Sequence, residues 1–324
     1  MVLNKKGETR ALNKKGEIMV LNKRGMFFTL LAIVIISIFV LSFIFIPGRD
    51  ERKTVERRIK TMNNFVFAVE EDLPRHLYTA GFRSIFIFER EIFEGESYIT
   101  NLNGKFNELF FYGTLGGQKE ELMRDANFSK IEEKLREKAT KINANLSLFN
   151  ASVEISQADP WNVRVRLNAT LVIEDYSGLV GWNKNSVFDA YIPISEFDDP
   201  IYVIGTNGQV LHKMVQANDT NFADNGVLIE HVYHSYYIAS PNRGSSFLDR
   251  LQGDFSADAN GVESLVNLQE LSQKGIAAKP GKSIVDYIYF SNENPASCVV
   301  DSGLPSWFRL DDPLHTGIYQ ASCA

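Results

Sequence analysis

An uncharged apolar stretch at residues 26–46 constrains this chain more than any other feature of its sequence. The only polar side chains in it are Thr29, Ser37 and Ser42. A helix of that length spans roughly 30 Å, the thickness of a bilayer's hydrocarbon core, and satisfies its backbone hydrogen bonds internally. A secretory signal peptide has a shorter apolar part and a small-residue cleavage site, which residues 46–49 do not provide. The sequence therefore predicts a single transmembrane helix over residues 26–46.

The residues at the start of this stretch resemble a known processing site. Lys23-Arg24-Gly25 is followed directly by Met26-Phe27-Phe28-Thr29-Leu30, which is similar to the class III signal peptide of archaeal type IV prepilin-like proteins. The resemblance implies that a prepilin peptidase cuts between Gly25 and Met26 and leaves the apolar helix as the new N-terminus. Many pilins carry a glutamate at the fifth mature position, where this chain has Leu30, so a minor or solitary subunit is favoured over a major filament subunit. The implied partners are the lipid bilayer, the peptidase and other pilin-like subunits.

The chain is also similar, over most of its length, to uncharacterised archaeal single-span proteins. The shared segments are Met-Asn-Asn-Phe at 62–65 and Ser-Leu-Val-Asn-Leu at 264–268. This second resemblance implies no activity.

The leader at residues 1–25 contains a short repeat and an excess of basic residues. Leu-Asn-Lys is followed by a basic residue and glycine at 3–7, 12–16 and 21–25. A tandem duplication around the start codon explains the repeat, so Met1 and Met19 are both candidate initiators. The leader carries a net charge of +5 and residues 49–60 carry +3. The positive-inside rule therefore favours a cytoplasmic leader only narrowly. If translation starts at Met19, the rule favours the opposite orientation.

Composition predicts a folded acidic domain after the helix. The formal net charge is −6 for the whole chain and −11 for residues 26–324 once the leader is removed. Such a domain is not expected to bind nucleic acid. With 44% hydrophobic residues and 23 phenylalanines, it contains ample material for a core.

Two further features agree with an exported domain. N-x-[ST] sequons predict glycosylation at Asn127, Asn145, Asn150 and Asn218, whereas the sequon at Asn168 falls inside a strand-like run. The only cysteines, Cys298 and Cys323, flank a segment rich in proline and glycine. We expect them to form a disulfide, which on loop-closure entropy contributes about 3 kcal/mol; two buried free thiols are the alternative. These features place the C-terminal domain outside a single-pass cell-membrane protein.

The pattern after the membrane helix predicts an amphipathic helical stalk at 49–93, followed by an α+β ectodomain at 94–324. An apolar stripe with helical spacing supports the stalk, and Pro74 is expected to kink or end it. A further helix is predicted at 129–143, capped by Ser129. The stripe consists of Val55, Ile59, Met62, Val66, Val69 and Leu73.

Alternating patterns in the ectodomain predict an antiparallel sheet. The clearest alternation covers 163–173, and other strands are predicted at 146–155, 186–194, 201–204, 227–238 and 283–290. Asn207-Gly208 and Asn225-Gly226 are turn signals. Short helices are predicted at 247–251 and 262–271, the second stopped by Gly275.

No motif in the chain predicts catalysis, a cofactor or a metal site. Gly275 to Ser283 approximates a P-loop but has one residue too many between its glycines. His231 and His234 would point to opposite faces of the predicted strand. The segment 311–315, Asp-Asp-Pro-Leu-His, approximates the base and orienter of a serine hydrolase with Ser256 as a loose nucleophile, but is interpreted as a solvated acidic turn.

Charged side chains elsewhere are interpreted as surface features. The acidic residues at 89, 91, 94 and 96 are expected to form a polar helix face. Arg164 and Arg166 share one strand face, where pairing with acids and holding an anionic glycan are both open.

The sequence therefore favours a structural or interaction role, such as that of a minor pilin or pseudopilin. The alternatives are a single-span receptor or solute-binding module, and an ectoenzyme with a non-standard hydrolase site. A deep pocket with convergent polar groups in 200–324 would favour the alternatives. A flat head on a continuous N-terminal helix would favour the pilin-like role.

Overall fold

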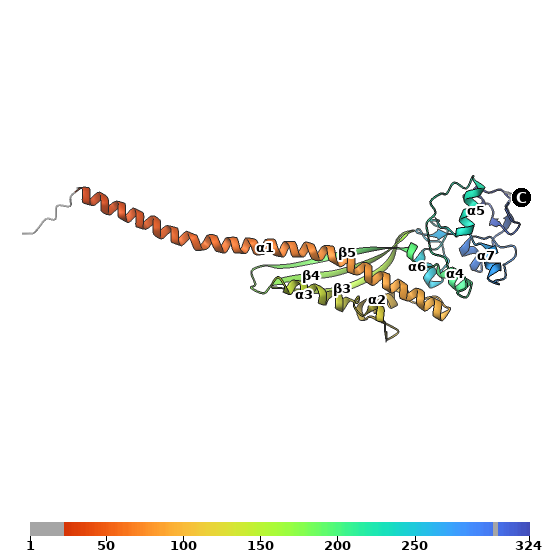
Figure 1. Ribbon diagram of the computed structural model, residues 1–324, viewed down its shortest axis with the longest axis horizontal. Helices are drawn as coiled ribbons and strands as arrows, with labels where there is room; N and C mark the ends of the chain where they lie inside the picture. Colours follow the sequence, from red (N-terminus) through yellow and green to blue (C-terminus); the bar gives the residue numbers. More distant parts are fainter. Residues whose placement is uncertain (1–22, 301–303) are drawn as a thin grey trace, which may run out of the picture. The chain divides into compact units, whose positions relative to one another are not determined.

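The structure, a computed structural model, describes residues 23–300 and 304–324. The first two copies of the repeat and the two candidate initiators lie outside the described residues. The chain divides into two compact units at the Lys60–Thr61 boundary. Each unit is considered by itself, and Figure 1 labels their elements in chain order.

Helix α1 (Lys23–Gly95) contributes residues to both units. In the second unit, Met62, Val66 and Leu73 of the predicted stripe are buried, whereas Ile59 in the first unit is 40% exposed. The helix continues through Pro74, so the expectation of an end there was wrong. Proline removes one backbone hydrogen bond, and burial of apolar side chains on either side of it, including Leu77, offsets that loss.

Three long antiparallel strands form the sheet of the second unit. They are β3 (Ala144–Asp159), β4 (Asn162–Asp175) and β5 (Gly181–Pro193), in the order β3-β4-β5. The alternation that predicts β4 matches its burial, because every second residue from Val163 to Ile173 is buried. The register places Val165 between Ile155 and Ala190.

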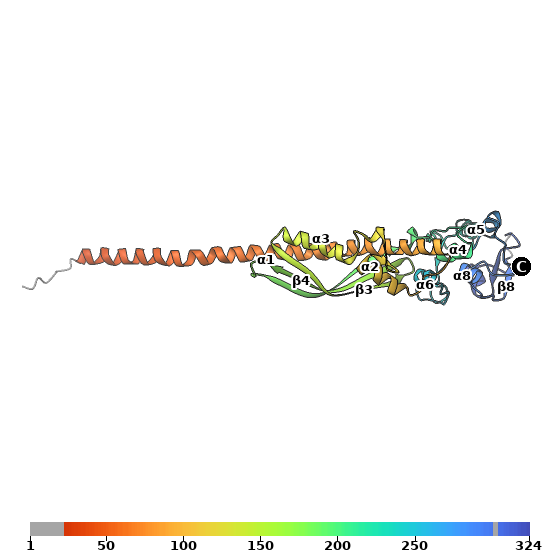
Figure 2. The same ribbon diagram turned by 90° about the horizontal axis from the view of Figure 1, so that it is seen from below.

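The C-terminal part of α1 and helix α3 (Phe128–Thr140) lie over one face of this sheet (Figure 2). Gly81 marks the close approach of α1, because a Cβ there would lie 2.5 Å from Ile192 Cδ1 and 2.7 Å from Val165 Cγ2. Between α1 and α3 the chain forms a helix, a two-stranded hairpin and a 3-10 turn: α2 (Leu102–Tyr112), β1 (Thr114–Leu115), β2 (Gln118–Lys119) and η1 (Glu121–Met123).

The cap of α3 differs from the prediction. The Asn127 side chain accepts the backbone N–H of Lys130 at 3.1 Å, so Asn127 is the N-cap and Ser129 lies inside the helix. Both residue types are good caps, and the sequence offered two within three positions.

Residues 194–300 and 304–324 form an irregular region of short elements. Their bounds are η2 (Ile194–Glu196), α4 (Pro200–Gly205), α5 (Asn225–His234), β6 (Ile238–Ala239), α6 (Phe247–Gln252), β7 (Val262–Glu263), α7 (Leu268–Gln273), α8 (Asp286–Phe290), β8 (Ser297–Val299), β9 (Arg309–Asp311) and α9 (Leu314–Ile318). Two-stranded pairs β6-β7 and β8-β9 are the only sheets among the described residues of this region.

Three predicted strands in this region are helices. Residues 201–204 lie in α4, because the Asp199 side chain caps the helix at Ile201 and Pro200 occupies its first turn. Most of 227–238 lies in α5, where Asp224 accepts from Gly226, so Asn225-Gly226 begins a helix and is not a hairpin turn. Most of 283–290 lies in α8, a short and largely buried run in which Asp286 is followed by aromatic and aliphatic residues, and its periodicity could not distinguish helix from strand.

The other local predictions had mixed outcomes. Asn207 and Gly208 both have positive φ, as the turn signal predicts. The helix at 247–251 is α6. The helix predicted at 262–271 is divided between β7 and α7, and Gly275 follows α7 with φ +78°.

Candidate functional site

The segment Gly25–Phe43 of α1 is long and apolar enough to cross a membrane. None of it is buried, and Ile36 and Phe39 are 61% and 63% exposed. Two of its three hydroxyl groups bond within the helix: Thr29 Oγ1 donates to Met26 O at 3.0 Å and Ser37 Oγ to Ile33 O at 2.7 Å. A segment whose exposed surface is mostly hydrocarbon, and whose backbone hydrogen bonds lie within the helix, suits an apolar solvent.

The predicted processing residues lie at the start of this segment. A Cβ added to Gly25 would meet nothing within 4 Å, and Met26 is 53% exposed. The bond between them is therefore not covered by any described part of the chain.

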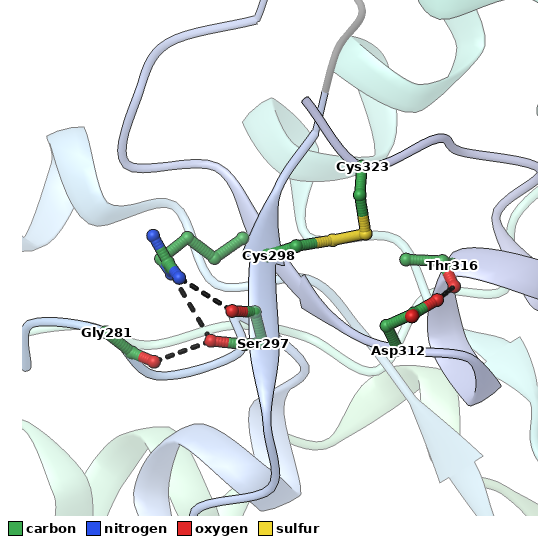
Figure 3. The surroundings of a disulfide bond; sticks show 7 residues. Gly281, Ser297, Cys298, Asp312, Thr316 and Cys323 are labelled. Carbon is green, nitrogen blue, oxygen red and sulfur yellow. Dashed lines mark hydrogen bonds between the residues drawn. A yellow bond between two sulfur atoms is a disulfide. The ribbon is translucent and has the colours of Figure 1, made fainter.

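The disulfide expected from the sequence joins Cys298 and Cys323 across a sequence separation of 25 residues (Figure 3). Cys298 lies on β8, and Cys323 lies next to Val300 in an isolated bridge. Ser297 Oγ donates to Gly281 O at 2.6 Å. The bond ties the last residues of the chain to the β8-β9 pair.

The asparagines predicted to be glycosylated have different settings. Asn150 is exposed at the bulge in β3, with φ 51°, and Asn218 is exposed in a loop. Asn145 is half-buried in β3 opposite Glu174. Asn127 caps α3 through its side chain.

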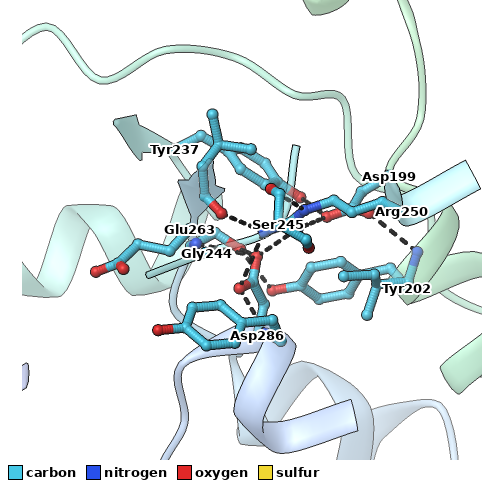
Figure 4. Close-up of polar contacts among 12 residues, drawn as sticks. Asp199, Tyr202, Tyr237, Gly244, Ser245, Arg250, Glu263 and Asp286 are labelled. Atoms are coloured by element: carbon cyan, nitrogen blue, oxygen red, sulfur yellow. Dashed lines mark hydrogen bonds and ion pairs between the residues drawn. The ribbon is translucent and has the colours of Figure 1, made fainter. Parts of the chain in front are cut away.

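A buried ionic cluster around Arg250 of α6 joins several short elements (Figure 4). Arg250 is fully buried and donates through Nη1 to Asp199 Oδ2 at 2.5 Å and to Asp286 Oδ2 at 2.8 Å. Tyr237 donates to Asp199 at 2.7 Å and Ser264 Oγ to Asp286 at 2.8 Å. Burial opposes its charge, but the two carboxylates hold the pKa of Arg250 above its ordinary value. Because Asp199 and Asp286 both accept hydrogen bonds from Arg250, the cluster fits a structural role.

A second buried cluster contradicts the interpretation of 311–315 as a solvated turn. His315 is fully buried, and its Nδ1 lies 2.7 Å from Asp311 Oδ2. Its Nε2 lies 3.1 Å from the Tyr287 hydroxyl and 3.4 Å from Glu263 Oε2. Burial lowers the pKa of His315, but Asp311 and Glu263 outweigh burial and raise it to about 9. The spacing of Asp311 and His315 on either side of the α9 start therefore produces an internal ion pair.

A cavity of about 360 Å³ opens beside this second cluster. Tyr287, Asp311 and His315 line it together with Arg243 and Ser256. The structure thus brings the Ser256 loop and the Asp311–His315 pair to one cavity. Both ring nitrogens of His315 already face other groups, Asp311 on Nδ1 and Tyr287 and Glu263 on Nε2. The arrangement lacks the serine-to-histidine bond that a hydrolase needs.

A groove of about 290 Å³ lies where the end of α1 meets α4. Phe86, Phe93 and Leu211 line it and are each about half exposed. Glu89 also lines it and accepts the backbone N–H of Asp198, so Glu89 does not belong to a solvated polar face. Burial raises the pKa of Glu89 to about 8.

The remaining sequence candidates are occupied by structural contacts. His231 is buried on α5, within hydrogen-bond distance of Asp219 O, while His234, at the end of the same helix, stacks on Tyr236 just beyond it. The strand-based reason for separating the two histidines was therefore wrong. Within residues 23–300 and 304–324, no group of three or more His, Cys, Asp or Glu could hold a metal ion.

Arg166 forms a two-bond pair with Asp189 on the open sheet face, at 2.7 and 2.8 Å. Its neighbour Arg164 donates to Ser156 Oγ at 3.0 Å. Of the two roles left open for these arginines, Arg166 pairs with an acid.

Sequence reasoning missed Arg243 and Arg250, and it assigned Glu89 to a polar face. A single arginine or glutamate carries no spacing signal, and the partners of Arg250 lie 51 and 36 residues away. No protein-family model, no curated protein and no solved structure matches this chain.

Proposed function

We propose that this chain is a membrane-anchored, exported surface protein of the prepilin-like kind, with a structural or interaction role. The observation that carries the proposal is the segment Gly25–Phe43, which is apolar and wholly unburied. Exposing that much hydrocarbon to water is strongly unfavourable, so the segment requires lipid or apolar partner helices around it. The basic residues and glycine directly before it support processing at Gly25.

Within this proposal the partners are the lipid bilayer, a prepilin peptidase and other pilin-like subunits. The mature chain would begin at Met26, with the apolar segment held in the membrane and residues 61–324 outside. Leu30 at the fifth mature position argues for a minor or solitary subunit.

Paired arginine substitutions test the anchor. Ile36→Arg with Val40→Arg places two charges in the apolar segment, at a cost of about 5–7 kcal/mol on insertion scales. We expect this variant to leave the carbonate-resistant membrane fraction. The matched control, Ile59→Arg with Phe67→Arg, changes two exposed apolar residues of the same helix outside that segment and is expected to stay in the membrane. Equal extraction of both variants would contradict the anchor.

The disulfide supplies a test of export. Disulfides persist in oxidising compartments and are rare in the cytosol. Cells are quenched with acid and then treated with maleimide. The native chain should react with maleimide only after its disulfide is reduced. In Cys298→Ser, Cys323 should react without reduction. Full labelling of the unreduced native chain would place residues 298–323 in a reducing compartment.

The cavity beside His315 favours a second candidate function, a solute-binding module on the same anchor. It lies in 200–324, where the receptor alternative requires a pocket, and polar side chains converge on it. Equilibrium dialysis of the detergent-solubilised chain against small solutes tests this candidate, and saturable retention is the expected result.

A further inference from the structure

Arg243 is the unpaired cation of the cavity beside His315. No described residue forms a hydrogen bond or ion pair with its guanidinium, and its Nε is buried without a partner. A buried donor without an acceptor costs about 1–3 kcal/mol, and more when it is charged, so such a group calls for a functional explanation. Arg250, the fully buried arginine of this region, pairs with two carboxylates.

The backbone holds Arg243 in a fixed position. Its N–H donates to Ser240 O at 3.2 Å, and Asn242 N–H donates to Asp258 O at 2.7 Å. Two glycine backbones cross next to this turn, since a Cβ on Gly261 would lie 2.0 Å from Gly244 O. The turn therefore fixes the backbone of Arg243 at the cavity lining.

The charges around the cavity define the ligand's charge. Asp311 is committed to His315 and Ser283, at 2.7 and 2.8 Å. Glu293 also lines the cavity, and its carboxylate would repel a dianion. A single negative charge directed at Arg243 is therefore the best match.

The remaining lining defines the ligand's body. Phe255, Ile288 and Leu314 give the cavity apolar walls, and the buried Tyr287 hydroxyl adds a polar atom at the His315 end. A volume of about 360 Å³ lies at the small end of the range for small-molecule sites. The planar guanidinium fork matches a carboxylate through two parallel hydrogen bonds.

We propose that this cavity binds a small organic carboxylate, with its carboxylate on Arg243 and its hydrocarbon part against Phe255, Ile288 and Leu314. The inference rests on the second candidate function, solute binding, and names its ligand class. It does not depend on processing at Gly25.

Thermal unfolding of the full-length, detergent-solubilised chain tests the inference with butyrate and its neutral isostere butyramide. At 20 mM ligand and matched ionic strength, butyrate should raise the Tm by about 2 °C or more, because a ligand bound only to the folded state stabilises it. Butyramide and inorganic phosphate should not. Arg243→Gln should abolish the butyrate shift, and Arg124→Gln, which changes an exposed arginine elsewhere, should retain it.

The outcomes separate the ligand class from the function. An equal shift with butyramide, or a shift with phosphate alone, would leave solute binding standing and overturn the carboxylate assignment. No shift with any of the three compounds would overturn both. A butyrate shift that persists in Arg243→Gln would place the site elsewhere. If Arg243→Gln does not fold, Arg243→Lys replaces it: loss of the two-bond fork should weaken butyrate binding about tenfold, and unchanged binding would contradict the proposal.

Discussion

Two stretches of α1, residues 25–43 and 61–95, have the same secondary structure but bury their apolar side chains differently. Residues 25–43 are apolar on every side and none of them is buried. Residues 61–95 are apolar mainly along one stripe, and that stripe lies in the core of the second unit. Both stretches are helical although their surroundings differ. The distribution of apolar residues around the helix axis indicates whether a stretch faces lipid or a protein core.

The comparison teaches where each stretch obtains its stability. A helix that is hydrophobic all round and unburied depends on surroundings outside its own fold. A striped helix depends on side chains it meets within the fold, such as Val165 and Ile192 beside Gly81. Substitutions of similar chemistry should therefore have different consequences in the two stretches.

Truncation of a leucine or isoleucine should give the largest contrast. Leu77 is fully buried and Ile36 is 61% exposed. We expect Leu77→Ala to lower the free energy of unfolding of residues 61–324 by about 2–5 kcal/mol, because it leaves a cavity. Ile36→Ala should leave that free energy unchanged. Urea unfolding followed by tryptophan fluorescence measures this, since all three tryptophans lie after Thr61. Similar losses of unfolding free energy in the two variants would contradict the proposed difference between the two stretches of α1.

Addition of a methyl group sharpens the packing half of the comparison. Glycine to alanine within a helix ordinarily stabilises by about 1 kcal/mol. Gly81→Ala should instead destabilise by about 1–3 kcal/mol, because the new Cβ would lie 2.5 Å from Ile192 Cδ1. Gly317→Ala in α9 meets nothing within 4 Å and should be neutral or stabilising. A stabilised Gly81→Ala would show that α1 does not press on the sheet.

A buried carboxyl on α1 adds a pH dependence that the apolar stretch cannot have. Burial raises the pKa of Glu89 from 4.5 to about 8, opposed by the hydrogen bond from the Asp198 backbone N–H and by the charge of Lys213, and assisted by the charge of Asp198. Between these values the folded chain retains a proton that the unfolded chain has lost, so stability falls as pH rises from about 4.5 to about 8.

Replacement of Glu89 by glutamine isolates this contribution. Glu89→Gln should flatten that part of the profile and, at pH 8.5, exceed the native chain by on the order of 1–2 kcal/mol, after allowance for partial exposure. Urea unfolding at pH 5.0, 6.5 and 8.5 provides the measurement. Parallel pH profiles for the two chains would rule out the raised pKa.

The smallest expected effect concerns an exposed ion pair between α1 and the sheet edge. Lys184 Nζ lies 2.9 Å from Glu70 Oε1, and the lysine side chain is 56% exposed. Glu70→Ala should cost no more than about 1 kcal/mol, as for other solvent-exposed pairs. A larger loss by the same unfolding assay would mean that this contact, rather than the stripe, holds α1 in place.

The long elements could be predicted because their patterns were long. The alternation over 163–173 corresponds to β4, and the stripe from Met62 to Leu73 corresponds to the buried face of α1. The same patterns did not predict the elements of residues 194–324 correctly, because most of those elements are six residues long or shorter. Such elements are set by caps and long-range contacts, and the cap of α4 is only an Asp-Pro pair, Asp199 and Pro200, before a short apolar run.

The candidate sites divide in the same way. Cys298 and Cys323 could be paired from the sequence because no other cysteines compete. Arg243 could not be identified, because its property is the lack of a partner among residues brought together only by folding. The Asp311–His315 pair was visible as a spacing, but its burial was not, since the groups that stabilise it include Glu263 from a distant strand.

The mass of the mature chain, purified from native membranes, tests the central claim most directly. We expect a chain that begins at Met26 and has a closed disulfide. Any additional mass from glycans should be removed by deglycosylation. Gly25→Leu should prevent this processing, whereas Gly16→Leu, in the matching repeat without an apolar stretch after it, should not. A native chain that begins at Met1 or Met19 would contradict prepilin-type processing and leave an ordinary single-span anchor.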